Sequence, residues 1–249
     1  MNGSLEGRVA IVTGAGRGIG EAIMRAFVRE GARVAICARH QEALDALAAP
    51  LSPAVLPLAC HVGRKADLET LVRRTETELG PVDILVNNAA TNVQQGYCLD
   101  ATEEQFDKMV EVNLKSAFRL VAAVAPGMVA RGRGSIINIA SVAGVKPQFE
   151  SLLYSMTKAA LIMMTKSWAL ELGPKGLRAN AIAPGLVQTR LSEYFWKDES
   201  RREAAFGSQP IRHLGQPEEI AEIAVLLAGD RASYMTGEVV VADGGFLLT

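Results

Sequence analysis

Strand-like and helix-like segments alternate along the whole chain, and this alternation restricts the possible folds more than any other feature of the sequence. Short apolar runs rich in β-branched residues are followed by longer segments whose apolar residues recur at helical spacing. Strand, helix and strand in succession make a crossover unit, and repeated crossover units build a parallel sheet with helices on its faces. The sequence therefore predicts one doubly wound α/β domain spanning residues 1–249.

The alternation also places the individual elements. The strands of the parallel sheet are expected at residues 8–13, 33–38, 55–60, 83–87, 135–140, 177–183 and 238–242. The helices are expected at about residues 18–30, 41–48, 66–79, 102–130, 154–173 and 217–228.

One long stretch, from about 186 to 213, shows no regular pattern. It contains Tyr194, Phe195, Trp196 and Phe206 in a chain that is only 5% aromatic. Long loops in compact domains often cover an active site. We therefore expect this stretch to be a lid over a substrate. The alternative is a peripheral pair of hydrophobic helices packed on the core.

A glycine-rich turn, residues 13–20 (TGAGRGIG), joins the first expected strand to the first expected helix. In this context the free N–H groups and the positive end of the helix dipole bind a pyrophosphate, although an ordinary tight turn is the alternative. Ile19 stands where the third glycine of G-x-G-x-x-G would be, so T-G-x-x-x-G-x-G describes the turn better. The residues expected to contact a dinucleotide here are Gly14, Gly16, Arg17, Gly18, Ile19 and Gly20.

Tyr154 and Lys158 lie one turn apart on an expected helix, and Ser141 directly follows the expected strand 135–140. Chemistry in open α/β sheets collects at the carboxyl ends of the strands. A free tyrosine has a pKa of about 10, and the lysine ammonium together with an oxidised nicotinamide would lower it. We expect Tyr154 to exchange the proton, and Ser141 to hold the same oxygen, while a hydride passes between a nicotinamide and a carbonyl or alcohol. Taken singly, Ser141 is equally compatible with a loop cap and Lys158 with a solvated residue.

Composition argues against several other classes of protein. The formal net charge is -1, so no basic surface for nucleic acid is expected. No run of 18 apolar residues suggests a membrane span, and the first ten residues lack a signal-peptide pattern, so we expect a cytoplasmic protein. The three histidines do not cluster with cysteines at metal-ligand spacing, so no metal is expected. Cys37, Cys60 and Cys98 are expected to be buried free thiols.

These features together resemble the short-chain dehydrogenase/reductase family over nearly the whole chain. The resemblance is carried by Thr13–Gly20, Asn87-Asn88-Ala89-Ala90, Asn113, Ser141, Tyr154 with Lys158, Pro184-Gly185 with Thr189, and Asp243-Gly244-Gly245. It implies a Rossmann-type sheet of seven strands and a catalytic tetrad of Asn113, Ser141, Tyr154 and Lys158.

The resemblance also implies roles for residues around the cofactor. Asn113 would hold, through its helix backbone, a water that relays protons to Lys158, and Lys158 would bind the nicotinamide ribose. Val187 and Thr189 would hold the carboxamide. His61 departs from the wider family, where an Asp commonly contacts adenine, so adenine recognition at that position stays open. The further cofactor contacts implied are His61, Val62, Asn88, Ala89, Pro184 and Gly185.

The end of the second expected strand predicts NADP(H) rather than NAD(H). A protein that reads an unphosphorylated ribose places a carboxylate there, about 20 residues past the glycines. Here that place is held by Ala38, followed by Arg39, whose planar fork of donors suits a 2′-phosphate. Arg17 could approach the phosphate from the other side. The alternative for Arg39 is a surface ion pair with Glu42.

Four further segments, Cys60–Gly63, Asp83–Val86, Ala183–Val187 and Ala232–Glu238, resemble the NADP-dependent carbonyl/retinol reductase branch. This closer resemblance implies a small apolar ketone, aldehyde or secondary alcohol as the substrate. A 3-oxoacyl-(acyl-carrier-protein) reductase is the competing prediction, and a basic patch of Arg131, Arg133 and Lys175 at the cleft mouth would favour it. A nucleotide-binding regulatory protein of the same fold is a third alternative. The residues expected to contact substrate are Ser141, Val142, Phe149, Tyr154, Leu186, Leu191 and Phe195.

Two expected helices carry more apolar surface than one sheet face can cover. Together with the apolar end Phe246-Leu247-Leu248, they predict a homotetramer with dyad symmetry. The alternative is that all of these side chains belong to the core of one chain. The helix residues concerned are Phe106, Met109, Val110, Leu114, Phe118, Val121, Leu161, Met163, Met164 and Trp168.

Overall fold

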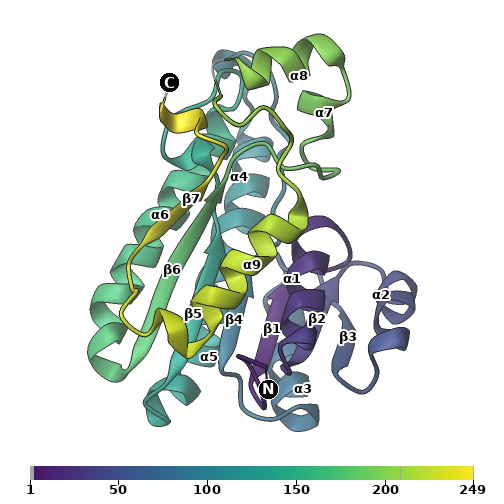
Figure 1. Cartoon of the computed structure of the whole chain (residues 1–249), viewed down its shortest axis with the longest axis vertical. Helices are drawn as coiled ribbons and strands as arrows, with labels where there is room; N and C mark the ends of the chain where they lie inside the picture. The colour runs from purple at the N-terminus through teal and green to yellow at the C-terminus, as the bar shows by residue number, and fades with distance from the viewer. Residues whose placement is uncertain (1–2, 208, 249) are drawn as a thin grey trace.

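The chain forms a seven-stranded sheet with strand order β3-β2-β1-β4-β5-β6-β7, and every neighbouring pair is parallel (Figure 1). The computed structural model describes residues 3–207 and 209–248. The predicted Rossmann-type sheet of seven strands is confirmed. The strands are β1 (Val9–Thr13), β2 (Arg33–Ala38), β3 (Val55–Ala59), β4 (Ile84–Asn87), β5 (Gly134–Ile139), β6 (Leu177–Pro184) and β7 (Val239–Ala242).

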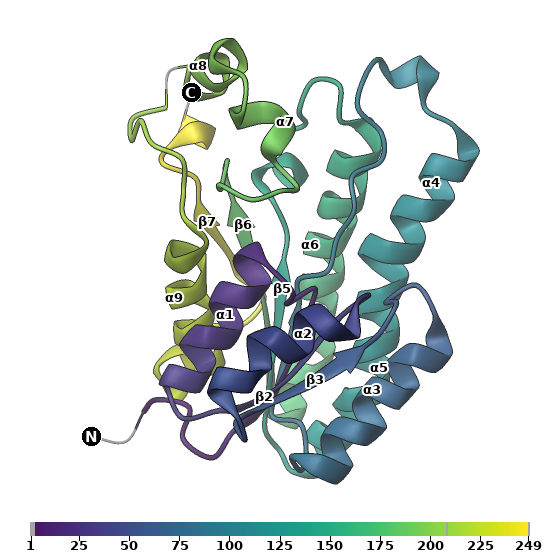
Figure 2. The same cartoon turned by 90° about the vertical axis from the view of Figure 1, so that its right-hand side faces the viewer.

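Helices cover both faces of this sheet, as Figure 2 shows. On one face lie α1 (Gly18–Arg29), α2 (Gln41–Ala48) and α9 (Pro217–Ala228). On the other face lie α3 (Lys65–Glu78), α5 (Ser116–Ala130) and α6 (Leu152–Leu172). Single turns of 3₁₀ helix occur at Ala49–Leu51, Cys98–Asp100, Val142–Gly144, Gly173–Lys175, Asp230–Ala232 and Phe246–Leu248.

The central strands are buried on both faces, so their side chains divide between two cores. Along β1, Ala10 and Val12 pack in the core under α1 and α9, whereas Val9 and Ile11 pack in the core under α3 and α5. Successive side chains of a strand point to opposite faces, which explains this split. Continuous apolar runs therefore mark the strands because neither face meets water.

The helical stretch expected at 102–130 is continuous but not uniform. It begins with α4 (Glu103–Val110), which Thr102 and Gln105 start with a reciprocal capping box. Residues Glu111–Lys115 then form one wider π-helical turn before α5 begins at Ser116. Such turns are frequent at functional sites. By length and hydropathy the stretch Glu103–Ala130 would suffice to cross a membrane, but half of its most apolar window is buried in the chain, as in a core helix.

The stretch 186–213 was expected to be irregular, and this was wrong. It contains two short helices, α7 (Glu193–Trp196) and α8 (Glu199–Phe206), which lie above the carboxyl ends of the strands (Figure 1). A parallel bridge between Val187 and Gly215 joins the two ends of the stretch. Helices this short are marginal by themselves and depend on tertiary contacts. The role of this segment as a substrate lid stays a prediction.

Candidate active site

The glycine turn is held against the end of β4 by hydrogen bonds that leave no room for side chains. The Asn88 amide nitrogen donates to the carbonyl oxygens of Thr13 (2.8 Å) and Gly14 (3.1 Å). A Cβ on Gly20 would lie 2.5 Å from that same nitrogen, and a Cβ on Gly14 would lie 2.8 Å from the Cα of Ala89. Gly14 also has a φ of +65°, which disfavours any other residue. These two glycines are therefore required by the fold of the turn itself.

Gly16 and Gly18 stand on the other side of the turn. A Cβ on Gly16 would come within 3.2 Å of the Cβ of Ala38, so the turn rests against the end of β2. A Cβ on Gly18 would come within 3.3 Å of the Thr189 side chain. The first helix thus begins between the segment after β2 and the segment after β6. No side chain caps the start of α1, so its first N–H groups are available to a ligand.

Two arginines flank this turn on the β2 side. Arg17 and Arg39 are both exposed. Among the residues that the structure describes, neither forms an ion pair, and the alternative pairing of Arg39 with Glu42 does not occur. Their guanidinium groups are therefore available to an anion near Ala38.

His61 is held in place by two contacts after β3. Its backbone N–H donates to the carboxylate of Asp67 (2.8 Å), and its ring Nδ1 accepts from the N–H of Gly63 (3.2 Å). Because Nδ1 is an acceptor here, the neutral ring carries its proton on Nε2. His61 is therefore not merely a packing residue, since a local hydrogen bond orients its ring.

Ser141, Tyr154 and Lys158 are brought together as expected. The phenol of Tyr154 and the hydroxyl of Ser141 form a hydrogen bond. The Lys158 ammonium donates to the carbonyl oxygen of Ile139 (2.7 Å), the last residue of β5, and lies 5.5 Å from the centre of the Tyr154 ring. Lys158 is 3% exposed. The end of β5 and the first turns of α6 thus present the three polar groups to one place.

Gly144 allows this arrangement, and the sequence analysis did not identify it. The single turn Val142–Gly144 after Ser141 lies directly on the backbone of α6. A Cβ on Gly144 would lie 2.6 Å from the carbonyl carbon of Lys158 and 2.8 Å from the nitrogen of Ala159. Any side chain at this position would therefore push Ser141 away from Tyr154 and Lys158. The sequence shows only a glycine three residues after Ser141. Its importance cannot be recognised until the structure shows that α6 packs directly against this glycine.

Asn113 lies in the π-helical turn, and its side chain does not contact Lys158. Its Oδ1 accepts from the backbone N–H of Thr91 (2.8 Å), and its Nδ2 donates to the Thr91 carbonyl oxygen (2.9 Å) and the Thr157 hydroxyl (3.1 Å). The side chain thus joins the segment after β4 to α6. The water that the family resemblance assigns to its backbone stays a prediction.

Burial shifts the pKa values of both Tyr154 and Lys158 in the chain without a cofactor. Burial raises the pKa of Tyr154 to about 12, against which the hydrogen bond from Ser141 acts in the lowering direction. Burial also lowers the pKa of Lys158 to about 8. In the chain without cofactor, removal from water disfavours the charged form of each group, and the expected lowering of the tyrosine pKa by Lys158 together with an oxidised nicotinamide stays a prediction. At neutral pH the site therefore holds a neutral phenol beside an ammonium.

A cavity of about 550 Å³ opens in front of these groups. Asn88, Ser141, Tyr154 and Lys158 line its polar side. Several lining residues were not among the expected contacts, including Asn92, Lys146, Gln209 and Phe246. All of the expected substrate contacts line the cavity: Ser141, Val142, Phe149, Tyr154, Leu186, Leu191 and Phe195. Of the cofactor contacts expected beyond Tyr154 and Lys158, those that line it are Ile19, Asn88, Pro184, Gly185, Val187 and Thr189.

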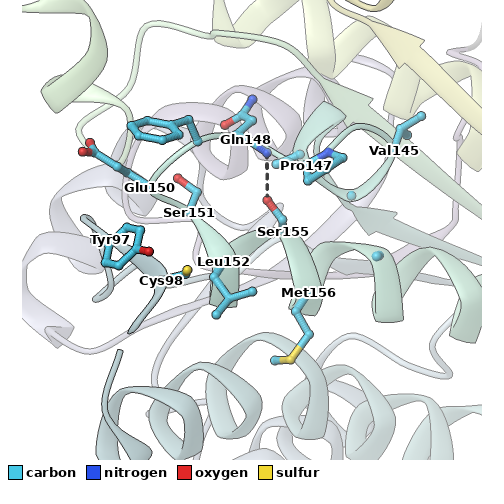
Figure 3. Close-up of a pocket in the computed structure, with 14 residues that line it drawn as sticks. Tyr97, Cys98, Val145, Pro147, Gln148, Glu150, Ser151, Leu152, Ser155 and Met156 are labelled. Atoms are coloured by element: carbon cyan, nitrogen blue, oxygen red, sulfur yellow. Dashed lines mark hydrogen bonds between the residues drawn. The ribbon is translucent and has the colours of Figure 1, made fainter. Parts of the chain in front are cut away.

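A second cavity, of about 510 Å³, shares the segment 147–151 with the first (Figure 3). Tyr97, Leu152 and Met156 line it, and Ser155 on the same wall accepts a hydrogen bond from the backbone N–H of Gln148 (3.3 Å). Cys98 also lies there and is exposed, contrary to the expectation that all three thiols are buried. Cys37 and Cys60 are buried free thiols.

Comparison with known proteins identifies the family. The sequence profile described as enoyl-(acyl carrier protein) reductase matches residues 14–247. Dehydrogenase/reductase SDR family member 4 of Sus scrofa is 43% identical over 244 residues, which is 97% of this chain and 88% of that protein. The chain belongs to the short-chain dehydrogenase/reductase family. A second relative of this short-chain dehydrogenase/reductase, the 3-oxoacyl-(acyl-carrier-protein) reductase FabG of Thermotoga maritima, is 37% identical over 98% of this chain and 99% of that protein.

A solved structure supports the same assignment. The crystal structure of gox2181 superposes with a TM-score of 0.95 at 32% identity, covering 98% of this chain and 97% of that one. The chain is therefore an oxidoreductase of the short-chain dehydrogenase/reductase family, and the family implies a nicotinamide cofactor. The uncapped start of α1 and the close packing at Gly14 and Gly20 fit such a dinucleotide.

The basic residues that were candidates for a patch at the cleft mouth lie elsewhere. Arg131 donates to the carbonyl oxygen of Val82, and Arg133 pairs with Asp83 (3.2 Å) just before β4 begins. Lys175 precedes β6. All three therefore lie at the amino ends of the strands, opposite the cavity, because residues that enter parallel strands gather at one edge and those that leave them gather at the other.

We predict that Gly144→Ala lowers kcat by at least about tenfold, because small displacements of reacting groups are costly. The Kd for the nicotinamide cofactor should change less than kcat, since an added Cβ on Gly144 meets the backbone of α6 and not the glycine turn. Steady-state kinetics and fluorescence titration measure the two quantities. Gly173→Ala is the matched control, because it lies at the other end of α6 with no atom within 4 Å of the added Cβ. Equal activity of both variants would contradict the positioning role of Gly144.

Proposed function

We propose that this protein is an NADP(H)-dependent oxidoreductase that transfers a hydride between the nicotinamide and a carbonyl or secondary alcohol, reducing apolar ketones or aldehydes. One observation carries the proposal. The proton-transfer group Tyr154, with Ser141 and Lys158, faces a cavity whose remaining wall is mostly apolar. Apolar walls reward apolar substrates at about 25 cal/mol per Å² of surface buried.

The chemistry assigned to each residue follows from its protonation state. When bound, the reduced cofactor supplies the hydride to the carbonyl carbon. Tyr154, neutral at physiological pH, donates its phenolic proton to the carbonyl oxygen, and the Ser141 hydroxyl donates a hydrogen bond to the same oxygen. The Lys158 ammonium stabilises the phenolate that remains. A neutral Tyr154 phenol beside a Lys158 ammonium is the protonation state in which ketone reduction begins, so it favours reduction over alcohol oxidation.

Several groups around the cavity would hold the cofactor. The N-terminus of α1 and the turn before it suit the pyrophosphate, and Arg17 and Arg39 suit a 2′-phosphate beside Ala38. Asn88, Ile19 and Thr189 line the cavity between this turn and Lys158. Residues Val187 and Thr189 remain the proposed contacts of the carboxamide.

The reduction of a 3-oxoacyl group on an acyl-carrier protein is the second candidate function. The similarity to the Thermotoga maritima reductase supports it. The position of Arg131, Arg133 and Lys175 away from the cavity speaks against docking of an acidic carrier protein on those residues. We therefore prefer a free small-molecule carbonyl as the substrate.

A homotetramer in the cytoplasm completes the proposal. Several apolar side chains on the outer face of α5 and α6 have no cover within the chain, among them Phe118 (58% exposed), Met163 (62%) and Leu170 (78%). Met109, Val121 and Leu161, which were expected on the same surface, belong to the core instead. Phe246 lines the cavity, with the Lys146 ammonium 5.7 Å from its ring centre, so the chain end also serves the site.

The proposed activity is tested by mixing the protein with NADPH and a panel of aryl ketones, diketones, an acetoacetyl thioester and a sugar, and following absorbance. We expect higher kcat/KM for an aryl ketone or diketone than for the sugar or the thioester. Tyr154→Phe should lower kcat by about 10²–10⁴ while the Kd for NADPH changes little, because only the acid group is removed. A Tyr154→Phe variant that keeps more than about a tenth of kcat would exclude Tyr154 as the proton donor. Binding of NADPH without any turnover would favour a regulatory protein.

The reductive rate should depend on the charge of Lys158. Below its pKa of about 8 the lysine is an ammonium, and above that value it becomes neutral. The phenolate formed on Tyr154 then loses its stabilising neighbour. We expect kcat/KM for ketone reduction to be level from about pH 6 to 7.5 and to fall above about pH 8, approaching tenfold for each further pH step of one. A level profile up to pH 9.5 would exclude this role for Lys158.

The end of β2 should set the choice of cofactor. A charge-assisted contact between Arg39 and a 2′-phosphate is worth roughly 1.5–3 kcal/mol, so we expect kcat/KM to favour NADPH over NADH by about ten- to a hundredfold. The double variant Ala38→Asp/Arg39→Leu should reverse the preference, because a carboxylate repels the phosphate and accepts from a ribose hydroxyl. A wild type that prefers NADH, or a double variant with an unchanged ratio, would refute the assignment.

A further inference from the structure

The hydroxyl of Ser192 lies at the centre of a group of hydrogen bonds between β6 and α7. Its oxygen accepts from the backbone N–H of Thr189 (3.2 Å) and from the ring N–H of Trp196 (3.2 Å). The same oxygen lies within hydrogen-bonding distance of the Val187 carbonyl oxygen and of the hydroxyl (3.0 Å) and carbonyl oxygen (3.1 Å) of Thr189. A hydroxyl has one proton to donate and two acceptor positions, so these contacts use its full capacity.

The segment directly after β6 is fixed to the core and borders the glycine turn. Val187 is 4% exposed, and a parallel bridge pairs it with Gly215. The backbone N–H of Gln188 donates to the carbonyl oxygen of Gly215 (2.8 Å). A Cβ on Gly18 would lie 3.3 Å from the methyl group of Thr189, so the segment also stands beside the expected cofactor site. The Ser192 hydroxyl therefore has a firm support on this side.

The other side of the group carries part of the cavity wall. Trp196 ends α7, and the two residues before it, Tyr194 and Phe195, line the active-site cavity. The rings of Tyr194 and Phe195, which we call the aromatic wall, pack edge to face with their centroids 5.2 Å apart. The ring N–H of Trp196 also donates to the carbonyl oxygen of Thr189 (3.0 Å). Trp196 and Ser192 thus join the aromatic wall to the segment after β6.

The four residues of α7 do not hold the aromatic wall in place by themselves. Helices this short are marginal in water. The ion pair between Glu193 and Lys197 runs along the helix itself and is largely exposed, so it contributes little. Removing the Ser192 hydroxyl would take an acceptor from both the Trp196 ring and the Thr189 backbone. The position of the aromatic wall therefore depends on this hydroxyl.

We propose that Ser192 is a positioning residue for substrate binding. Its hydroxyl holds the aromatic wall over the cavity, so the affinity for ketones large enough to reach that wall depends on it. The inference rests on the proposed function, because it concerns the same carbonyl substrate. Ser141, Tyr154 and Lys158 lie at the end of β5 and in α6, outside the contacts of Ser192. Loss of the hydroxyl should therefore weaken the binding of large ketones and leave the chemical step nearly unchanged.

The experiment compares benzil with 2,3-butanedione as substrates. The two diketones share the reacting group, and only benzil carries rings that can pack against the aromatic wall. In Ser192→Ala we expect KM for benzil to rise at least about fivefold, while KM for 2,3-butanedione and kcat for both diketones change less than about twofold. Ser192→Thr keeps a hydroxyl and should hold KM for benzil within about twofold of wild type.

The fluorescence of Trp196 follows the contact itself. Trp168 and Trp196 are the two tryptophans of the chain, so Trp168→Phe leaves Trp196 as the single indole. In this background Ser192→Ala should increase the quenching of Trp196 emission by acrylamide, because the ring loses a hydrogen bond that holds it. Unchanged quenching would contradict the role of Ser192.

Two further variants assign the effect on KM. Ser200→Ala removes a hydroxyl from the same stretch of chain, where it donates to the carboxylate of Asp198 (2.6 Å), and should leave both KM values unchanged. Trp196→Phe keeps an aromatic ring and removes the N–H, so it should raise KM for benzil as Ser192→Ala does. It tests the same contact independently where Ser192→Ala fails to fold.

The selective loss of affinity for benzil decides the matter. Unchanged KM for benzil in Ser192→Ala or Trp196→Phe, an equal rise in KM for both diketones, or a fall in kcat at unchanged KM would refute the role of Ser192 and leave the proposed function standing. Turnover of 2,3-butanedione but not of benzil by wild type would do the same. No turnover of either diketone by wild type would refute both.

Discussion

The close approach of β1 to β4 supports the whole site. The strand order reverses between these two strands, since β2 and β3 lie on one side of β1 and β4 to β7 lie on the other. In open α/β sheets a crevice forms at such a point, outside the carboxyl ends of the strands. Thr13 and Asn88 bond across it, with the Thr13 hydroxyl accepting the backbone N–H groups of Asn88 and Ala89, both at 3.0 Å. The glycines of the turn are needed because this clamp brings backbone and amide groups into contact.

A second close contact, between Gly144 and α6, places the proposed proton-transfer groups at the edge of the same crevice. It brings Ser141 to Tyr154 and buries Lys158 against the end of β5. Burial opposes the charge on the lysine and on the phenolate, which is why the Lys158 pKa falls to about 8 while that of Tyr154 rises to about 12. Removal from water therefore destabilises the charged forms of both groups, and hydrogen bonds and nearby charges at such buried groups are stronger than in water.

Most of the fold could be predicted because its signals are local. Each of the seven strands lies within one residue or so of its expected bounds, since burial on both faces makes an apolar run with a clear start and end. The π-helical turn at Glu111–Lys115 could not be predicted, because it leaves the apolar pattern of a continuous helix nearly unchanged. The short helices α7 and α8 were missed because contacts such as that of the Trp196 ring nitrogen with the Thr189 carbonyl oxygen (3.0 Å) hold them, and not their own propensity. The exposure of Cys98 likewise could not be predicted, because it depends on the path of the segment between β4 and α4 relative to α6.

By itself, the sequence determined the crossover topology, the family and the residues that meet at the carboxyl ends of the strands, because periodicity and spacing act over short distances along the chain. The tertiary structure decided the rest. Burial raises the pKa of Tyr154. The basic residues Arg131, Arg133 and Lys175 lie at the opposite ends of the strands from the cavity. The side chain of Asn113 forms hydrogen bonds with Thr91 and Thr157. Desolvation and hydrogen-bond completeness depend on every neighbour in space, and those neighbours come from segments far apart in the sequence.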